Sequence, residues 1–289
     1  MTARVLARWI SSMSLALAAG ALLGQPSQPA TYIPQTKFAK GQDIVPSFDG
    51  WLRNPDGSFT LVFGYLNRNY EEELAIPAGA ENRLDPGPMD QGQPTYFLPR
   101  RHAWVYRVRV PADFGNKELV WFLTANGKTE KAYGHLFPDE ELLERVIQTR
   151  GNLSPGLDDP NKPPSLSIAP VQGAVSSAPL TLTAMVTDDG LPKPRVPKER
   201  PQTEPGKAQS NSATALPRLG LNVVWAQYRG PAKATFDESG PIVIGASSGP
   251  ASTKVRFAQP GTYVLRATAN DGQLSSSADV TILVSAAAR

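Results

Sequence analysis

Residues 221–236 read LNVVWAQYRGPAKATF, and residues 252–284 read STKVRFAQPGTYVLRATANDGQLSSSADVTILV. Apolar and polar residues alternate in three runs, and Gly, Pro, Asn and Asp separate the runs. Alternation with a period of two is typical of a strand with one buried face, and turn residues between short strands are typical of antiparallel sandwiches. This part of the chain therefore predicts a β-sandwich built from two antiparallel sheets.

Three residues of this region have specific expected roles. Trp225 lies in the middle of a strand, where its ring can fill the space between the two sheets. Tyr263 lies near the start of its strand, at the position typical of a tyrosine corner, with the ring inward and the hydroxyl bonded to the backbone. Gly272 allows the positive φ that the turn into the last strand needs. All three roles are structural.

The same region carries five short motifs that resemble PKD-type immunoglobulin-like domains. They are Val223-Val224-Trp225, Gly230-Pro231, Pro260-Gly261-Thr262-Tyr263, Asn270-Asp271-Gly272 and the final strand 280–284. The resemblance covers residues 165–285 and is concentrated after Leu221. It implies an immunoglobulin-like fold and a secreted or cell-surface protein, but no particular ligand or reaction. The segment 191–218 departs from the family pattern.

The composition fits two β domains of modest size. The chain has 289 residues, of which 40% are apolar and 19% charged, so it can form packed cores. Its 28 prolines and 24 glycines favour many turns over long helices. Because there is no cysteine, the sequence excludes disulfides, thiolate metal sites, a cysteine nucleophile and a cysteine-linked lipid anchor.

The N-terminus has the pattern of a targeting segment. Arg4 and Arg8 precede an apolar run from Trp9 to Leu23 that is too short for a comfortable membrane span. We expect a signal peptide over residues 1–24, cleaved near Gly20 or Gly24; the alternative is an uncleaved N-terminal anchor. No later stretch is apolar enough to span a bilayer.

The basic balance of the chain does not indicate a nucleic-acid partner. Removal of residues 1–24 takes away two arginines and no acid, so the net charge of +3 falls to +1. An exported protein without cysteine fits a bacterial envelope, in the periplasm or outside the cell, better than a eukaryotic secretory route.

The rest of the chain is predicted to be all-β and to form two sandwich domains. In the first, strand-like runs such as 102–111 alternate apolar and charged residues, and Asn126-Gly127 is a hairpin signal. The predicted parts are a flexible leader (25–45), an N-terminal β-sandwich (46–138), a helix (139–150), a Pro-rich linker (151–164) and the immunoglobulin-like domain (165–289). Its segment 191–218, with charge +4 and several prolines, is predicted to be a disordered insertion, either a solvated spacer or a contact for anionic envelope polymers.

Candidate binding residues concentrate in the N-terminal domain. Asn67, Arg68 and Asn69 follow a buried strand, where a rigid scaffold can present a binding loop. Arg100, Arg101 and His102 form a basic trio that can hold an anionic glycan or carboxylate. The simpler interpretations are a solvated strand end and a charged strand entry. Tryptophans can stack on sugars; we expect Trp104 and Trp121 in the core and Trp51 exposed.

Metal and catalytic signals are weak. Asp188, Asp189 and Asp271 can meet at one end of the sandwich and supply oxygens to calcium, although no DxDxDG loop is present and ordinary Asp-Gly turns explain them equally well. The only histidines, His102 and His135, do not lie in HExxH or any paired-ligand spacing. We expect no other cofactor and no catalytic residues.

These observations predict an exported, non-catalytic binding or scaffolding protein of the bacterial envelope. Its β-sandwich loops would be presented to a protein or glycan partner. One alternative is a carbohydrate-active enzyme, or its accessory module, with the site in residues 46–138. A second is a calcium-dependent adhesion module.

Overall fold

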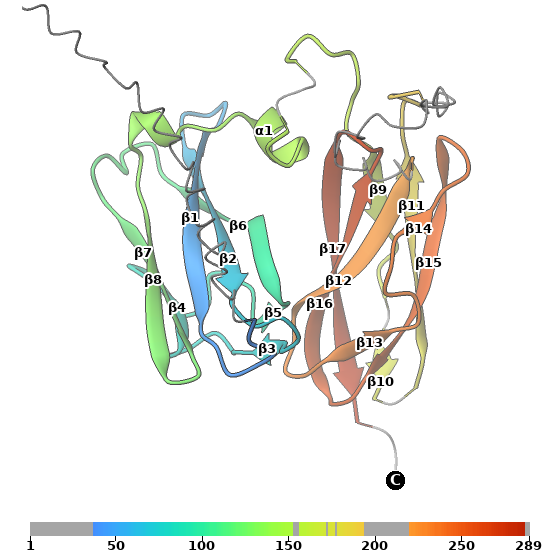
Figure 1. Ribbon diagram of the computed structural model, residues 1–289, viewed down its shortest axis with the longest axis horizontal. Helices are drawn as coiled ribbons and strands as arrows, with labels where there is room; N and C mark the ends of the chain where they lie inside the picture. Colours follow the sequence, from blue (N-terminus) through green and yellow to red (C-terminus); the bar gives the residue numbers. More distant parts are fainter. Residues whose placement is uncertain (1–36, 153–155, 172, 177, 194–219, 287–289) are drawn as a thin grey trace, which may run out of the picture. The chain divides into compact units, whose positions relative to one another are not determined.

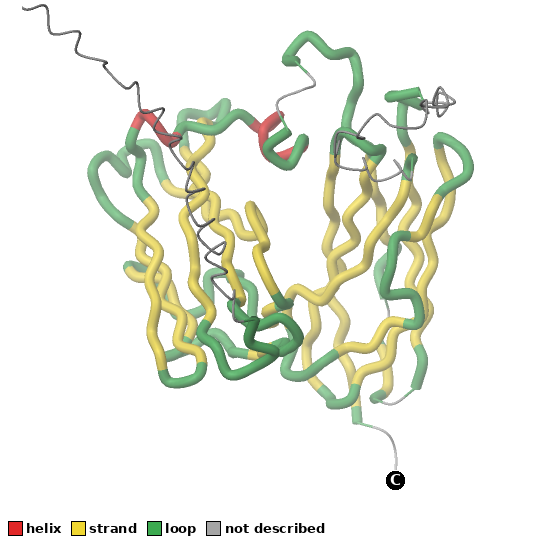
Figure 2. The backbone as a smooth tube through the Cα atoms, in the orientation of Figure 1, coloured by secondary structure: helices red, strands yellow, loops and turns green. Residues whose placement is uncertain are grey.

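The computed structural model describes residues 37–152, 156–171, 173–176, 178–193 and 220–286, and these belong to one compact unit. The predicted signal segment and most of the predicted leader lie outside the described residues, as do residues 194–218 of the predicted insertion. The described part is built almost entirely of strands, which confirms the all-β class (Figure 1, Figure 2).

The N-terminal domain is a sandwich of two small antiparallel sheets with a two-stranded ribbon beside them. One sheet has the order β1 (Ile44–Arg53), β2 (Phe59–Asn67), β6 (Arg100–Val110), and the other the order β4 (Asn82–Asp85), β7 (Leu119–Ala125), β8 (Lys128–Gly134). The ribbon pairs β3 (Leu74–Ala75) with β5 (Tyr96–Phe97). Phe63 and Trp121 are fully buried in the core between the sheets. The turn Asn126-Gly127 joins β7 to β8 with positive φ at both residues, as the sequence predicts.

Both neighbours of β2 are irregular opposite its middle. In β1 the pairing shifts around Asp49, and in β6 residues 103–105 all lie opposite Gly64. Trp104, within this second bulge, has φ 55°. The bulge turns the Trp104 ring out of the regular alternation, so it is half-buried and not a full core residue as predicted.

The second domain has the strand order of an immunoglobulin-like sandwich. One sheet runs β13 (Ala234–Phe236), β15 (Ser248–Phe257), β11 (Leu180–Thr187), β9 (Ser165–Ile168), and the other runs β10 (Ala174–Val175), β17 (Ser275–Ser285), β16 (Gly261–Asn270), β12 (Asn222–Arg229), β14 (Ile242–Val243). All neighbours are antiparallel except β10 and β17. If the edge strands β10 and β14 are set aside, the other seven are strands A to G in chain order. The two sheets are then D-E-B-A and G-F-C, as in the immunoglobulin fold.

The structural roles predicted for this domain are confirmed. Trp225 and Tyr263 are 4% and 0% exposed in the core between the two sheets. The Tyr263 hydroxyl donates to the carbonyl of Gln259 at 3.0 Å, which is the expected tyrosine corner. Gly272 has φ 98° in the turn between β16 and β17.

The prediction of a single helix over residues 139–150 is wrong. A 3-10 turn, η1 (Pro138–Glu140), and a five-residue helix, α1 (Glu144–Gln148), stand in its place. Between them the chain is extended, because the Leu142 amide donates to the carbonyl of Trp51 at 2.7 Å and Glu141 bridges to the same residue. Docking on β1 therefore overrides the local preference for a continuous helix.

Arg266 of β16 contacts the N-terminal domain. Its guanidinium pairs with Asp279 on β17 at 2.7 and 2.9 Å and lies 4.1 Å from the centre of the Tyr228 ring. Its Nη1 donates to the carbonyl of Val105 at 2.6 Å. Val105 belongs to the bulge of β6, so the irregular strand of one domain supplies the acceptor for an arginine of the other.

Candidate functional site

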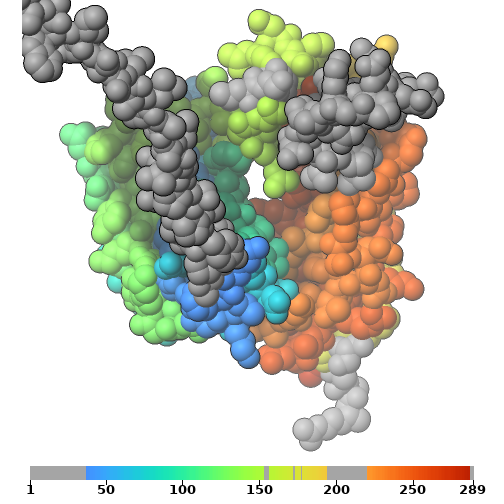
Figure 3. Space-filling model, viewed as in Figure 1, coloured from blue at the N-terminus to red at the C-terminus, as the bar shows by residue number. Residues whose placement is uncertain are grey.

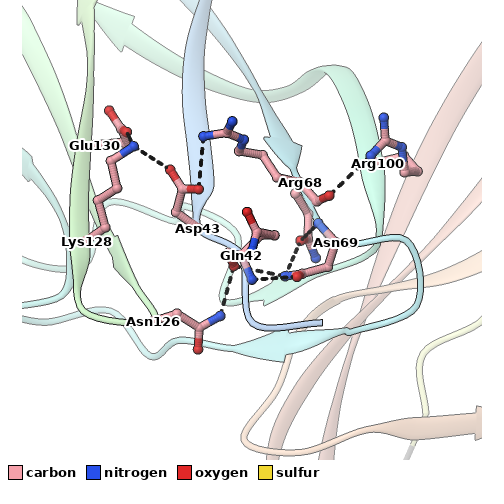
Figure 4. A network of polar contacts seen from close by, with 9 residues as sticks. Gln42, Asp43, Arg68, Asn69, Arg100, Asn126, Lys128 and Glu130 are labelled. Carbon is pink, nitrogen blue, oxygen red and sulfur yellow. Dashed lines mark hydrogen bonds and ion pairs between the residues drawn. The ribbon is translucent and has the colours of Figure 1, made fainter. Parts of the chain in front are cut away.

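Strand pairing brings the two basic segments of the N-terminal domain together at one end of its first sheet. β2 and β6 are antiparallel, with Asn67 opposite Arg100 and Leu66 opposite Arg101. The predicted binding loop after β2 and the predicted basic trio at the start of β6 are therefore neighbours. Figure 4 shows the polar network that surrounds them.

Asn67 and Asn69 hold the loop together and do not face solvent. Both are fully buried. Asn67 donates to the carbonyl of Glu72 at 2.8 Å, and its Oδ1 accepts from the backbone and side-chain amides of Asn69 at 3.1 and 2.9 Å. Asn69 in turn exchanges hydrogen bonds with the backbone of Gln42 at 2.7 and 2.9 Å. Their contact with a ligand stays a prediction, and the structure gives both amides another role, as partners of buried backbone groups.

A buried carboxylate anchors the same network. Asp43, 6% exposed, accepts from Arg68 at 3.2 Å and from Lys128 at 2.9 Å, and Lys128 also pairs with Glu130 (Figure 4). Burial alone would raise the pKa of Asp43, but the hydrogen bond from Lys128 and the charges of Arg68 and Lys128 outweigh it, so the pKa lies below 3.8. The predicted site residue Arg68 is thus exposed but already ion-paired.

Arg100 is an exposed cation at this end of the sheet. Its guanidinium lies 3.9 Å from the centre of the Tyr70 ring, and its Nη1 donates to the carbonyl of Arg68 at 3.2 Å. No carboxylate of the described residues pairs with it. Lys37 approaches the same ring at 5.3 Å. We call Lys37, Arg68, Tyr70 and Arg100 the Arg100 cluster.

The backbone of Arg100 is in an unfavourable conformation. Its φ of 73° lies in the left-handed region, where a residue with a long side chain costs about 1 kcal/mol or more. Such strain persists only where the surroundings impose it, and it concentrates at functional sites. Arg100 holds this conformation at the end of the β2–β6 ladder, opposite the buried Asn67.

The other two members of the basic trio have structural partners. Arg101 reaches Asp49 at 2.5 Å and Ser47 at 2.6 Å on β1. His102 stacks on Tyr65 with ring centres 5.0 Å apart, and its Nε2 lies 3.0 Å from the carbonyl of Pro99. Burial is the main reason that the pKa of His102 is lowered. Both side chains therefore already have partners within the protein.

Trp51 is also internal, so its prediction as an exposed stacking platform is wrong. It is 3% exposed, and its Nε1 donates to the carbonyl of Phe137 at 2.8 Å. The segment from Phe137 to Leu142 covers it, as the docking on β1 requires.

A cavity of about 540 Å³, which sequence reasoning missed, lies beside the Arg100 cluster. It is lined by Ala39, Lys40, Glu71, Glu72, Glu73, Ala75, Tyr96 and Lys233. The first described residues, drawn in blue, lie at the surface here (Figure 3). The three consecutive glutamates are visible in the sequence. Their approach to Tyr96 and Lys233 is not, because these two residues are remote in sequence.

The cavity's carboxylates are largely engaged. Glu73 accepts from the Tyr96 hydroxyl at 2.5 Å and from Lys233 at 2.8 Å. Glu72 accepts from the amide of Gly41 at 2.7 Å. Burial, followed by the hydrogen bond to Glu73 and its charge, raises the pKa of Tyr96. The cavity therefore holds fixed carboxylates rather than a free acid/base pair.

The three aspartates predicted for calcium do not form one group. Among the described residues there is no cluster of three His, Cys, Asp or Glu side chains suited to a metal. Asp189 is exposed, and its two oxygens accept the backbone amides of Lys162 and Leu191. Asp188 and Asp271 are close enough for the charge of Asp271 to contribute to a raised pKa of Asp188, after burial as the main cause.

Comparisons with known proteins give a distant likeness of fold. No protein-family model and no curated protein matches the sequence. Among solved structures, the D00-D0 domain of intimin is 11% identical over 84% of this chain and 99% of its own, with a TM-score of 0.26. The titin I-band fragment I67-I69 is 9% identical over 84% and 65%, with a TM-score of 0.22.

An endo-fucoidan hydrolase of glycoside hydrolase family 107 is 12% identical over 88% of this chain and 28% of its own, with a TM-score of 0.25. Scores this low support no functional argument, and the fold assignment above rests on strand order. No helix in the described part of the chain has the length and apolar character needed to cross a membrane.

Proposed function

We propose that this chain is an exported, non-catalytic binding module of the bacterial envelope, and that its Arg100 cluster holds an anionic group of a glycan or protein partner. The observation that carries the proposal is Arg100 itself. It is exposed, unpaired with any described carboxylate, stacked on Tyr70 and set in a strained backbone conformation. A guanidinium presents a planar set of donors that matches a carboxylate or sulfate in two parallel hydrogen bonds.

The support beneath Arg100 makes it suitable for recognition. Asn67, Asn69 and Asp43 are buried and bonded, so the loop after β2 and the entry to β6 are held before a ligand arrives. Such preorganisation lowers the entropy that binding would otherwise cost.

The finer assignments follow the same proposal. We infer a PKD-type second domain because its five motifs lie on the turns and strands that build an immunoglobulin-like sandwich, with Trp225 and Tyr263 in its core. Export rests on the N-terminal pattern of residues 1–24. Cell fractionation with N-terminal sequencing of the mature protein tests it: an intact Met1 in the cytoplasmic fraction would exclude export.

The binding proposal is tested with R100A. Titration of the protein with a uronic-acid polymer and with a neutral glucan measures whether negative charge is recognised. We expect binding of the acidic polymer alone, weakened about tenfold in R100A, which corresponds to loss of one charged hydrogen-bonding group.

R83A is the matched control, because Arg83 also lies over an aromatic ring, Phe122 at 4.2 Å, and donates to a backbone carbonyl. We expect it to bind like the wild type. Equal affinity of R100A and the wild type would overturn the proposed site, and no acidic ligand at all would overturn the proposed ligand class.

A second candidate function is a carbohydrate-active enzyme or its accessory module, and the glutamate-lined cavity is the observation that favours it. Glu71 is exposed there, whereas Glu73 is bonded to Tyr96 and Lys233. Release of reducing ends from acidic polysaccharides by the wild type, lost in E71Q and E73Q, would favour the enzyme over the binding module.

A further inference from the structure

Three buried side-chain oxygens at one end of the second domain have no hydrogen-bond donor among the described residues. They are Asn161 Oδ1, Asp188 Oδ1 and Asp271 Oδ2. Asn161 and Asp271 are only 3% and 4% exposed. A buried polar atom without a partner is costly, and a carboxylate oxygen more so, because burial removes the water that would solvate it. Three such atoms in one region point to something that binds them.

Hydrogen bonds of neighbouring residues bring the three side chains to one place. Asn161 donates from Nδ2 to Gln273 at 2.9 Å, two residues after Asp271. The next residue, Lys162, donates its amide to Asp189 at 3.0 Å, beside Asp188. The linker therefore lies between the end of β11, which Asp188 follows, and the β16–β17 turn, which contains Asp271.

Each side chain is fixed through its other polar atom. Asp271 Oδ1 accepts the amides of Gln273 and Leu274 at 2.6 and 2.7 Å. Asp188 Oδ2 accepts the amide of Gly190 at 2.9 Å. The bond from Asn161 Nδ2 orients that amide in the same way. Local turn chemistry thus uses one atom of each group, and the remaining oxygen of each is held in place without a donor.

The donor set identifies the class of ligand. Two carboxylates and one amide carbonyl are hard oxygen ligands, with no nitrogen or sulfur that would favour zinc or copper. Calcium accepts six to eight oxygens in irregular geometry and tolerates partial filling by water and backbone carbonyls, whereas magnesium requires a near-ideal octahedron.

We propose that Asn161, Asp188 and Asp271 bind a calcium ion that joins the 151–164 linker to the second domain. This site differs from the three aspartates expected from sequence, since Asn161 takes the place of Asp189. The linker carbonyl of Asn161 also accepts from Arg145 of α1 at 2.8 Å. Calcium would therefore stabilise the connection through which the α1 segment meets the second domain.

The test is the melting temperature of the full chain with CaCl2, MgCl2 or EDTA, together with calorimetric titration of calcium. Extracellular calcium sites with few carboxylates bind at about 0.1–1 mM, so a few millimolar CaCl2 should raise Tm by about 4 °C over EDTA. D271N and N161A should lose this rise. D158N, which replaces an exposed aspartate of the same linker, is the matched control and should keep it.

A second readout separates metal binding from a merely structural role. In EDTA, D188N should melt at or above the temperature of the wild type, because it removes one of two carboxylates that each have a buried oxygen without a donor. It should nevertheless not respond to calcium. Absence of any calcium-dependent shift in the wild type, or a shift that survives in D188N and D271N, would overturn the site. An equal shift with MgCl2 would overturn the assignment to calcium.

Discussion

Arg101 and Asp49 meet across the central strand of the N-terminal sheet, with Nη2 and Oδ1 2.5 Å apart. They belong to β6 and β1, which do not pair with each other, and Gly64 of β2 lies between them. The Asp49 carboxylate also accepts the amide of Trp104 at 2.7 Å, so it closes the bulge in β6. This bulge supplies the Val105 carbonyl that Arg266 reaches from the second domain.

The contact depends on the missing side chain at Gly64. An added Cβ would lie within 3.0 Å of the Asp49 carboxylate, the Arg101 guanidinium and the carbonyl of His102. We expect G64A to lower the free energy of unfolding by about 1–3 kcal/mol, because a backbone carbonyl cannot move aside without shifting β6. Urea unfolding measures this.

G245A is the control for this prediction, because its Cβ would meet no atom within 4 Å. A loss of stability no larger in G64A than in G245A would show that the sheet accommodates the methyl group.

What the sequence predicted correctly is local. The Tyr263 hydroxyl reaches a carbonyl four residues earlier, and the Asn126-Gly127 hairpin involves only adjacent strands. Turn chemistry and strand periodicity are properties of short segments, so they can be read without knowledge of the rest of the fold.

The predictions that failed, and the contacts that were not predicted, all depend on residues far apart in the sequence. Trp51 is covered by a segment 86 residues away, and this docking also breaks the predicted helix. Lys233 joins Glu73 over 160 residues, and Asn161 joins Gln273 over 112. The convergence of Arg68 with Arg100 required the register of β2 and β6, which no single strand specifies.

Arg266 provides a test of the coupling between the two domains. In R266M the ion pair with Asp279 and the bond to Val105 are both lost, and the Val105 carbonyl is left without this donor. We expect a loss of about 1–3 kcal/mol, and two unfolding transitions in place of the one that we expect for the wild type.

Scanning calorimetry distinguishes one transition from two. The control is R256M, whose exposed ion pair with Asp237 on the same domain should contribute about 0–1 kcal/mol. If R266M and R256M gave the same profile, Arg266 would be an ordinary surface residue.

The lowered pKa of Asp43 predicts acid sensitivity. Because the folded protein binds this proton less readily than the unfolded chain, Asp43 stabilises the fold above about pH 4, and this contribution is lost as the pH falls through its folded pKa, below 3.8. D43N should be less stable than the wild type at neutral pH by about 1–3 kcal/mol.

The difference between D43N and the wild type should shrink as the pH falls below 3.8. Urea unfolding at neutral pH and at successively lower pH values checks this. A difference that stayed constant with pH would mean that the carboxylate charge does not act as described.

His102 makes a prediction in a higher pH range. Burial holds its pKa below 6.5, so the unfolded chain takes up the proton first as the solution is acidified. Stability from the neutral, stacked imidazole is complete above pH 6.5 and declines from there toward the folded pKa.

In H102F the ring can still stack on Tyr65 but cannot be protonated, so the decline below pH 6.5 should be smaller than in the wild type. Replacement of His135, which has a different set of partners, should leave the contribution of His102 in place. Urea unfolding in steps from neutral pH down to the range where Asp43 titrates measures how the free energy of unfolding changes with pH in H102F and in the wild type. The same change in both proteins would contradict the prediction.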